Sequence, residues 1–214
     1  MKRLGWIFVI LIVTGGCGKL GCGNPTCDIL SSDHDALYRR GDELIQPYLI
    51  LSDRASSRSS AKEADVRTGI ACLENALAVR PSNWSALWLR GKGFQALGEH
   101  LHAVESLRSA YLIEQTNPDV GRELMVELIE IQKFDEAVVI AEAVVRASPD
   151  NAGLKANLAL ALVLDRQLPR ARLMIADALR ADPSDAISEA LARRIEEISD
   201  GRRPQPHTFA ELQR

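Results

Sequence analysis

A 34-residue period is the feature of this sequence that most constrains its fold. Small residues recur at this spacing at Gly69, Ala103, Ala137 and Ala171. Two further sets of residues recur at the same spacing. One set is mostly small: Ala76, Ala110, Val144 and Ala178. The other is mostly large and apolar: Leu73, Leu107, Ala141 and Ile175. Self-similarity at a period of about 20–50 residues predicts a stack of structural repeats.

The composition of the repeats indicates helices. Residues 62–199 are rich in Ala and Leu, and the interruptions at Pro81, Pro149 and Pro183 share one register of the period. Ala and Leu are strong helix formers, whereas proline ends a helix. One helical hairpin cannot bury its apolar face alone, so neighbouring hairpins must stack and share a core.

This pattern resembles the tetratricopeptide repeat family. Three consecutive segments, 84–117, 118–151 and 152–185, carry most of the family's consensus positions. The matching residues are Leu87, Gly91, Phe94, Leu97, Gly98, Ala103, Leu107 and Ala110 in the first, Leu124, Leu128, Phe134, Ala137, Val144 and Pro149 in the second, and Leu158, Ala159, Leu162, Leu168, Ala171, Ala178 and Pro183 in the third. The resemblance implies an all-α fold, a right-handed solenoid of antiparallel helix pairs. We expect three clear repeats, a degenerate N-terminal repeat and a capping helix at 185–199.

The chain divides into five predicted parts. They are a signal peptide (1–16), a flexible tether (17–33), an N-terminal helix with a Ser-rich loop (34–61), the repeat domain (62–200) and a flexible tail (201–214). Gly and Pro in the tether and in the tail predict loose backbone there. The sequence leaves open whether residues 35–60 complete the first repeat or fill the groove of the solenoid.

The N-terminus reads as a targeting segment. Lys2 and Arg3 precede an apolar run, Leu4 to Val13, that is too short to span a bilayer stably. The small residues before Cys17 are similar to the lipobox of bacterial lipoproteins, although Thr14 stands where Leu is usual. The resemblance implies lipidation of Cys17 and a membrane-anchored protein of the bacterial cell envelope, with the outer membrane favoured by Gly18. The alternative is an ordinary secretory signal and a secreted or periplasmic protein.

The other cysteines leave several states open. Cys22 and Cys27 lie in a Gly/Pro-rich stretch and either pair in an oxidising compartment or stay free. Cys72 falls in a helical pattern, which predicts a small core residue.

The sequence carries no pattern of a catalytic or metal site. It has no glycine-rich phosphate loop, nucleophile elbow or zinc-protease motif. We interpret His100 and His102 as part of a solvated turn, and Glu127 with Glu130 as a charged helix face. The net charge of −3, with both signs interspersed, argues against nucleic acid as a partner. No enzyme activity, cofactor or metal is therefore predicted.

The family resemblance implies a partner-binding groove along the first helices of the repeats. Carried over by position, its apolar strip comprises Trp88, Val126, Ile129, Leu160 and Val163, with the cations Lys92 and Arg122 at the edge. An exposed strip of this kind marks a protein-binding surface. The alternative is that the strip is covered within the chain, Leu160, Val163 and Leu164 by the capping helix and Trp88 by the helix at 35–50. The carboxylate clamp that holds chaperone tails is not expected, because Lys92, Val126 and Leu160 stand where that clamp has Asn.

Two functions follow as hypotheses. The first is a membrane-tethered interaction module that binds a peptide or helix of another envelope protein in an open groove. The second is a structural subunit of a larger envelope assembly of the secretion or pilus type, with the groove filled by residues 35–50. Neither hypothesis fixes whether the chain self-associates.

Overall fold

The computed structural model describes residues 26–49 and 60–213, and within these ranges every regular element is a helix. The helices are α1 (His34–Leu49), α2 (Ser60–Val79), α3 (Trp84–Leu97), α4 (His100–Ile113), α5 (Pro118–Glu130), α6 (Phe134–Ala147), α7 (Ala152–Leu164), α8 (Leu168–Ala181), α9 (Ala186–Ser199) and α10 (Phe209–Gln213). The predicted all-α fold is confirmed. The signal peptide, Cys17, Cys22 and most of the Ser-rich loop lie outside the described residues.

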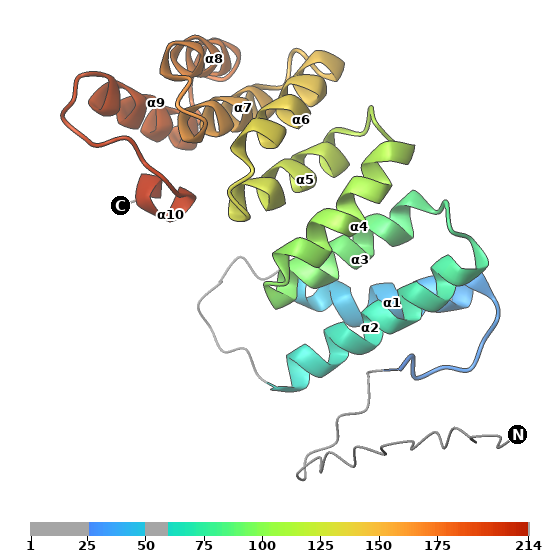
Figure 1. Ribbon diagram of the computed structural model, residues 1–214. Helices are drawn as coiled ribbons and strands as arrows, with labels where there is room; N and C mark the ends of the chain where they lie inside the picture. Colours follow the sequence, from blue (N-terminus) through green and yellow to red (C-terminus); the bar gives the residue numbers. More distant parts are fainter. Residues whose placement is uncertain (1–25, 50–59, 214) are drawn as a thin grey trace, which may run out of the picture.

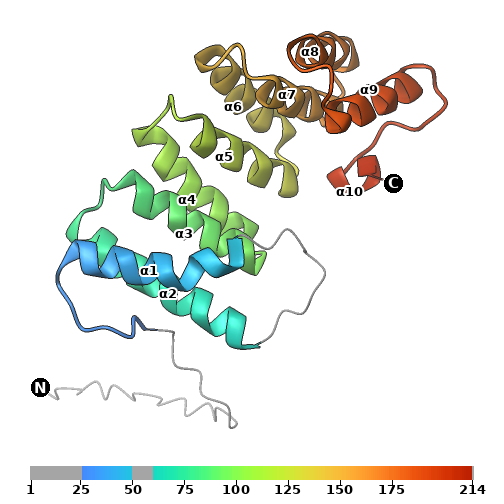
Figure 2. The same ribbon diagram turned by 180° about the vertical axis from the view of Figure 1, so that it is seen from behind.

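Consecutive helices pair as hairpins, and the hairpins stack in chain order (Figure 1). The pairs are α1–α2, α3–α4, α5–α6 and α7–α8, and α9 packs on both α7 and α8. The direction of the helix axes changes along the stack. In Figure 1, α8 is seen nearly end-on, whereas α1 and α2 are seen from the side. Helix α1 lies behind α2 in Figure 1 and in front of it in Figure 2, so the first helix of the first hairpin is on the face turned to the viewer in Figure 2.

The 34-residue period also sets where helices begin and turn. A side-chain oxygen caps the first helix of each later hairpin and α9, from Asn83, Asn117, Asn151 and Asp185. Such a cap satisfies a backbone N–H that has no partner inside the helix. Each of these hairpins then turns through a residue with positive φ at a second conserved spacing, Gly98, Gln132 and Arg166. The repeat signal is therefore carried by polar capping residues as well as by the core.

Small residues allow the two helices of a hairpin to approach closely. A Cβ on Gly91 would lie 2.6 Å from Leu107 Cγ, and one on Gly121 would lie 2.2 Å from Val144 Cγ2. Leu107 and Ala110 are fully buried, as the sequence columns predict. Packing of this density leaves no room for a side chain at either glycine.

Helices α1 and α2 form the complete first repeat. A Cβ on Gly41 would meet Leu73 Cγ at 2.6 Å, and one on Gly69 would meet the Gly41 carbonyl oxygen at 3.1 Å. Leu37 and Ile45 of α1 are fully buried in this contact. Residues 34–49 therefore pack as a first helix and do not fill the groove, which removes the observation on which the second functional hypothesis depended.

The structure corrects the predictions for the cysteines and for part of the tether. Cys27 is bonded to Cys72 of α2, with their Cα atoms 4.5 Å apart. Cys72 is a buried disulfide partner rather than a free core thiol, and Cys27 is paired with it rather than with Cys22. The disulfide and an ion pair between Asp28 and Arg40 hold residues 27 and 28 against the first repeat, so that this end of the predicted tether is fixed.

The prediction of a flexible tail is also wrong for residues 201–213. After α9 the chain loops out and returns, so that α10 lies beside α7 and α9 (Figures 1 and 2). Leu212 is 5% exposed and Pro206 is buried. Two side chains cap the returning turn: Thr208 Oγ1 accepts from the Glu211 N–H, and the Glu211 carboxylate accepts from the His207 N–H. The Gly and Pro residues of this segment therefore do not make it a flexible tail.

Candidate functional site

The predicted groove residues divide into an accessible group and a buried group. Trp88, Val126 and Leu160 are half-buried, whereas Ile129 is 4% exposed and Val163 is fully buried. The predicted apolar strip is therefore not continuous. We define the central face as Trp88 and Lys92 of α3 together with Arg122 and Val126 of α5.

A charge network joins the two helices of the central face. Lys92 Nζ lies 3.1 Å from Glu123 Oε1, and Arg122 Nη2 lies 3.3 Å from the same oxygen. Arg122 also contacts Asp119 at 3.2 Å. Burial of Glu123 raises the pKa of its carboxyl, but Lys92, Arg122 and a hydrogen bond from Gln95 outweigh this and hold the pKa below its usual value. Glu123 is thus an ionised carboxylate between the two cations Lys92 and Arg122.

Loss of Lys92 will destabilise the fold in a pH-dependent way. We expect Lys92→Met to lower the free energy of unfolding at pH 7 by about 2 kcal/mol, less than for an isolated buried ion pair because Arg122 and Gln95 still contact Glu123. The depressed pKa means that this stabilisation is present above the unfolded-state pKa and is lost as pH falls through the folded-state pKa. Urea unfolding at pH 7 and pH 3 measures both effects.

The control for this variant is Lys133→Met. Lys133 pairs with Glu136, and its side chain is 50% exposed. We expect a loss below about 1 kcal/mol there, as for other exposed ion pairs. Equal losses for the two variants at pH 7 would contradict the account of Glu123.

A second polar cluster corrects the predictions for His100 and Glu127. Glu127 is 1% exposed and accepts hydrogen bonds from Gln95 Nε2 and from His100 Nδ1, each at 2.8 Å. The turn at His100 is therefore docked on the next repeat, and Glu127 is a buried acceptor rather than part of a charged helix face. Glu130 is exposed, as expected. Gln95 of α3 thus contacts both Glu123 and Glu127 of α5.

Trp88 forms the apolar side of the central face. Its ring packs against both core clusters, and Lys92 Nζ lies 5.9 Å from the ring centroid. At that distance the cation is attracted to the ring face. The indole Nε1 is buried and donates to no acceptor among the described residues. Trp88 and Lys92 therefore form one surface, apolar beside cationic.

The C-terminal part of the predicted strip is covered from within the chain. Val163 belongs to the same core cluster as Ile195, Ile198 and Leu212, and Gln205 Nε2 donates to the Val163 carbonyl oxygen at 2.6 Å. Ile129 lies in this cluster as well. Sequence reasoning missed the part of this cover that residues 201–213 supply, because it treated residues 201–214 as loose.

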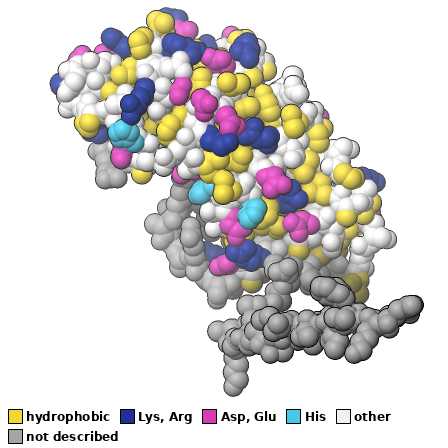
Figure 3. Space-filling view, in the orientation of Figure 1, with side chains coloured by type: hydrophobic (Ala, Val, Ile, Leu, Met, Phe, Trp, Pro, Cys, Tyr) yellow, Lys and Arg dark blue, Asp and Glu magenta, His cyan; other side chains and the backbone are white. Residues whose placement is uncertain are grey.

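Other features of the described residues do not add a chemical centre. Cys27, Asp28 and Cys72 bring three ligand-type side chains together, but the two sulfurs are joined as a disulfide and are not thiolate ligands. On the face seen in Figure 3, acidic and basic side chains are interspersed without a large single-sign patch. None of the helices within 26–49 and 60–213 combines the length and apolarity needed to cross a bilayer.

Comparison with solved structures identifies the architecture. MamA from Desulfovibrio magneticus RS-1, residues 41 to the end, superposes with a TM-score of 0.64 at 19% sequence identity, over 85% of this chain and 94% of that one. The chain has the fold of tetratricopeptide-repeat proteins. YrrB, described as a tetratricopeptide protein with an unusual peptide-binding site, gives 0.59 at 15% identity over 84% of this chain and 92% of its own.

Pseudomonas aeruginosa PilF is a further match, with a TM-score of 0.59 and 18% identity over 79% of this chain and 71% of that one. No protein-family model and no curated protein matches the sequence. At these identities the likeness shows the fold alone, so the function has to be argued from the residues of this chain.

Proposed function

We propose that this protein is an interaction module that binds a segment of another protein on its central face. The observation that carries the proposal is the arrangement of Trp88, Lys92, Arg122 and Val126 on two neighbouring first helices, where none of them is fully buried, whereas Ile129 and Val163 of the predicted strip are buried. An apolar surface rimmed by charge is typical of protein-binding sites. No catalytic step is proposed.

The apolar and cationic side chains of the central face determine which kind of ligand it would bind. Trp88 and Val126 provide apolar contact. Lys92 and Arg122 contact Glu123 at 3.1 and 3.3 Å, and Arg122 also contacts Asp119 at 3.2 Å. The Arg122 side chain is 43% exposed, and its guanidinium has five N–H donors, so it can donate further charge-assisted hydrogen bonds to an acidic group of a ligand. The ligand is therefore a peptide or helix that presents an apolar side chain next to an Asp, a Glu or a terminal carboxylate.

A selection from a random peptide library against the purified protein tests this. We expect enriched peptides to combine apolar and acidic residues and to bind Val126→Glu at least about tenfold more weakly, because the new carboxylate repels the ligand and interrupts the apolar contact. Val139→Glu is the control, since Val139 is 61% exposed on α6, outside the central face. Peptides whose affinity is unchanged by Val126→Glu would contradict the proposal.

We further propose that the module is tethered to a membrane of the bacterial envelope through lipidated Cys17. The disulfide between Cys27 and Cys72 supports an oxidising, extracytoplasmic compartment. Cys27 lies ten positions after Cys17, a reach of at most about 35 Å, so the first repeat would lie near the membrane surface.

Intact-mass analysis of the protein from bacterial membranes tests the tether. The proposal expects a chain that begins at Cys17 and carries a diacylglyceryl group. An unmodified chain in the soluble fraction, cut elsewhere, would contradict lipidation and leave the secreted or periplasmic alternative.

A further inference from the structure

We propose that the C-terminal strap, residues 204–213, occupies in cis a second peptide-binding site of the solenoid. The partner that takes its place is a protein segment of the same chemistry, a short helix after a proline with two apolar side chains three residues apart. This inference rests on the proposed function, because it assumes that the solenoid binds segments of other proteins. The second site lies on α7 and α9, whereas the central face lies on α3 and α5.

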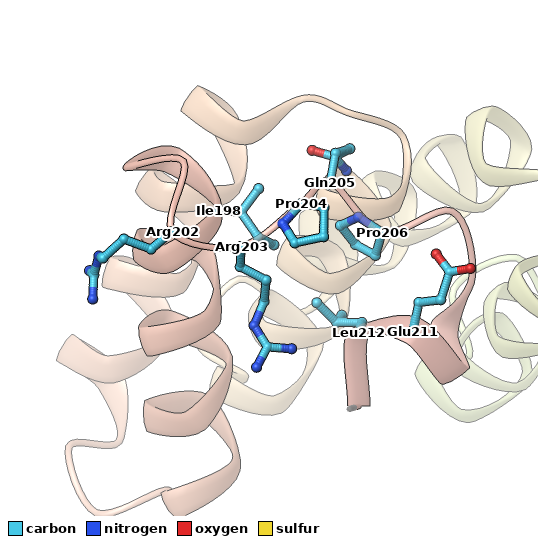
Figure 4. A pocket seen from close by; sticks show the side chains of 8 residues that line it. All are labelled: Ile198, Arg202, Arg203, Pro204, Gln205, Pro206, Glu211 and Leu212. Atoms are coloured by element: carbon cyan, nitrogen blue, oxygen red, sulfur yellow. The ribbon is translucent and has the colours of Figure 1, made fainter.

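The strap is seated by a few buried apolar side chains. Leu212 is 5% exposed and packs in the core cluster that contains Ile198 of α9 and Val163 of α7. Phe209 packs against the same cluster from one helical turn earlier. Figure 4 shows Pro204, Pro206, Ile198 and Leu212 gathered around one hollow, with the Arg202 side chain pointing away. Most of the strap's binding surface is thus concentrated in a short sequence motif.

Polar contacts join the strap to α7, to α9 and to the turn before α8, and two of them use main-chain oxygens. Gln205 Nε2 donates to the Val163 carbonyl oxygen at 2.6 Å, and Arg194 of α9 donates to the Leu212 carbonyl oxygen. His207 Nδ1 lies 3.1 Å from Arg166 Nη2 at the turn before α8. The solenoid therefore holds the strap at both ends, through its backbone and through spaced apolar anchors. A bound peptide is recognised by the same combination.

The strap covers the surface of α7 and α9 but leaves hollows beside it. A hollow of about 410 Å³ lies between the strap and the end of α9, and a second of about 260 Å³ lies between Pro206 and the turns at Gln132 and Arg166. Pro204, His207, Ala210 and Glu211 are exposed. Helix α10 has five residues, too few to be stable without its anchors. The strap can therefore dissociate from α7 and α9 while α9 continues to cap the stack of hairpins.

Competition between strap and peptide gives the proposal a measurable consequence. A strap joined to α9 by a short link has an effective concentration on the order of millimolar at its own site. A free peptide of the same sequence must compete with it. We therefore expect a labelled peptide of residues 202–214 to bind at least about 100-fold more tightly when the strap is disabled.

Fluorescence anisotropy on the mature chain tests this with two ways of opening the site. One protein ends at Arg203, and the other is the full chain with Phe209→Ala and Leu212→Ala. Ala210→Ser is the matched control, because Ala210 is an exposed strap residue and its replacement should leave the site closed. Circular dichroism establishes that each variant is folded.

The proposal expects both opened proteins to bind the peptide and the unaltered and Ala210→Ser proteins to bind it at least about 100-fold more weakly. Folded variants that do not bind it at about 1 mM would overturn the proposal, because the strap would then fail to occupy the site at its own effective concentration. Equal binding by all four proteins would place the peptide elsewhere and also overturn it. So would failure of both opened variants to fold, which would make the strap part of the core.

A further variant separates this inference from the proposed function. Val126→Glu on the chain that ends at Arg203 should leave binding of the strap peptide unchanged, since Val126 lies on the central face. Loss of library-peptide binding with retained strap-peptide binding would show two separate sites. Failure of the strap peptide alone would leave the central face untouched.

Discussion

Removal of the Cys27–Cys72 disulfide is expected to lower the free energy of unfolding by about 4 kcal/mol. The two cysteines are 45 residues apart in the sequence, and a cross-link over a loop of that length strongly restricts the unfolded chain. Cys27→Ser with Cys72→Ala also releases residue 27 from α2. Urea unfolding of this double variant and of the oxidised protein measures the difference.

Cys22→Ser is the matched control, because it removes the other cysteine of the same Gly/Pro-rich stretch. We expect its unfolding curve to match that of the unaltered protein, and peptide mapping without reductant to link Cys27 to Cys72. If Cys22→Ser destabilised the protein as much as the double variant, the pairing between Cys22 and Cys27 would be the correct one.

The second large effect is expected for Gly121→Leu. A Cβ at Gly121 already lies 2.2 Å from Val144 Cγ2, so a leucine cannot enter the space between α5 and α6 unless the helices separate. We expect a loss of about 4 kcal/mol, at the upper end for overpacking and despite the better helix propensity of leucine. Thermal and urea unfolding measure this loss.

Two further variants isolate the cause. Gly153→Leu places the same side chain in α7, where a Cβ would meet nothing closer than Asn151 Oδ1 at 3.4 Å, and we expect a change below about 1 kcal/mol. Val144→Ala in the Gly121→Leu background removes the clashing Cγ2 atom and should restore part of the stability. An equal loss for Gly121→Leu and Gly153→Leu would contradict the close approach of α5 and α6.

The period of the sequence predicted the helices and their small contact residues because both repeat at fixed spacing. The capping residues Asn83, Asn117, Asn151 and Asp185 follow the same 34-residue spacing. Because Asn and Asp are preferred at the N-cap, this spacing also indicates where the helices begin. The pairing of α1 with α2 was left open because the Ser-rich insertion breaks the spacing between Gly41 and Gly69.

The errors in the candidate site arise where partners lie far apart in the chain. Glu127 is buried because Gln95 and His100, 32 and 27 residues earlier, turn toward it. Val163 is buried because Gln205 and the strap return over α7, 42 residues later. No local pattern contains such contacts, and disulfide connectivity has the same difficulty. Trp88, Lys92, Arg122 and Val126 were predicted from their positions within the repeat, which depend on the local helix alone.

Binding at the central face is tested most directly by site-specific photo-crosslinking in cells that make the protein naturally. A photoreactive residue in place of Val126 samples the central face, and one in place of Val139 samples exposed surface on α6. The account predicts a discrete protein adduct from position 126 that is absent from position 139 and is lost when Lys92→Met is added. Adducts from position 139 alone, or none from position 126, would contradict a partner site on the central face.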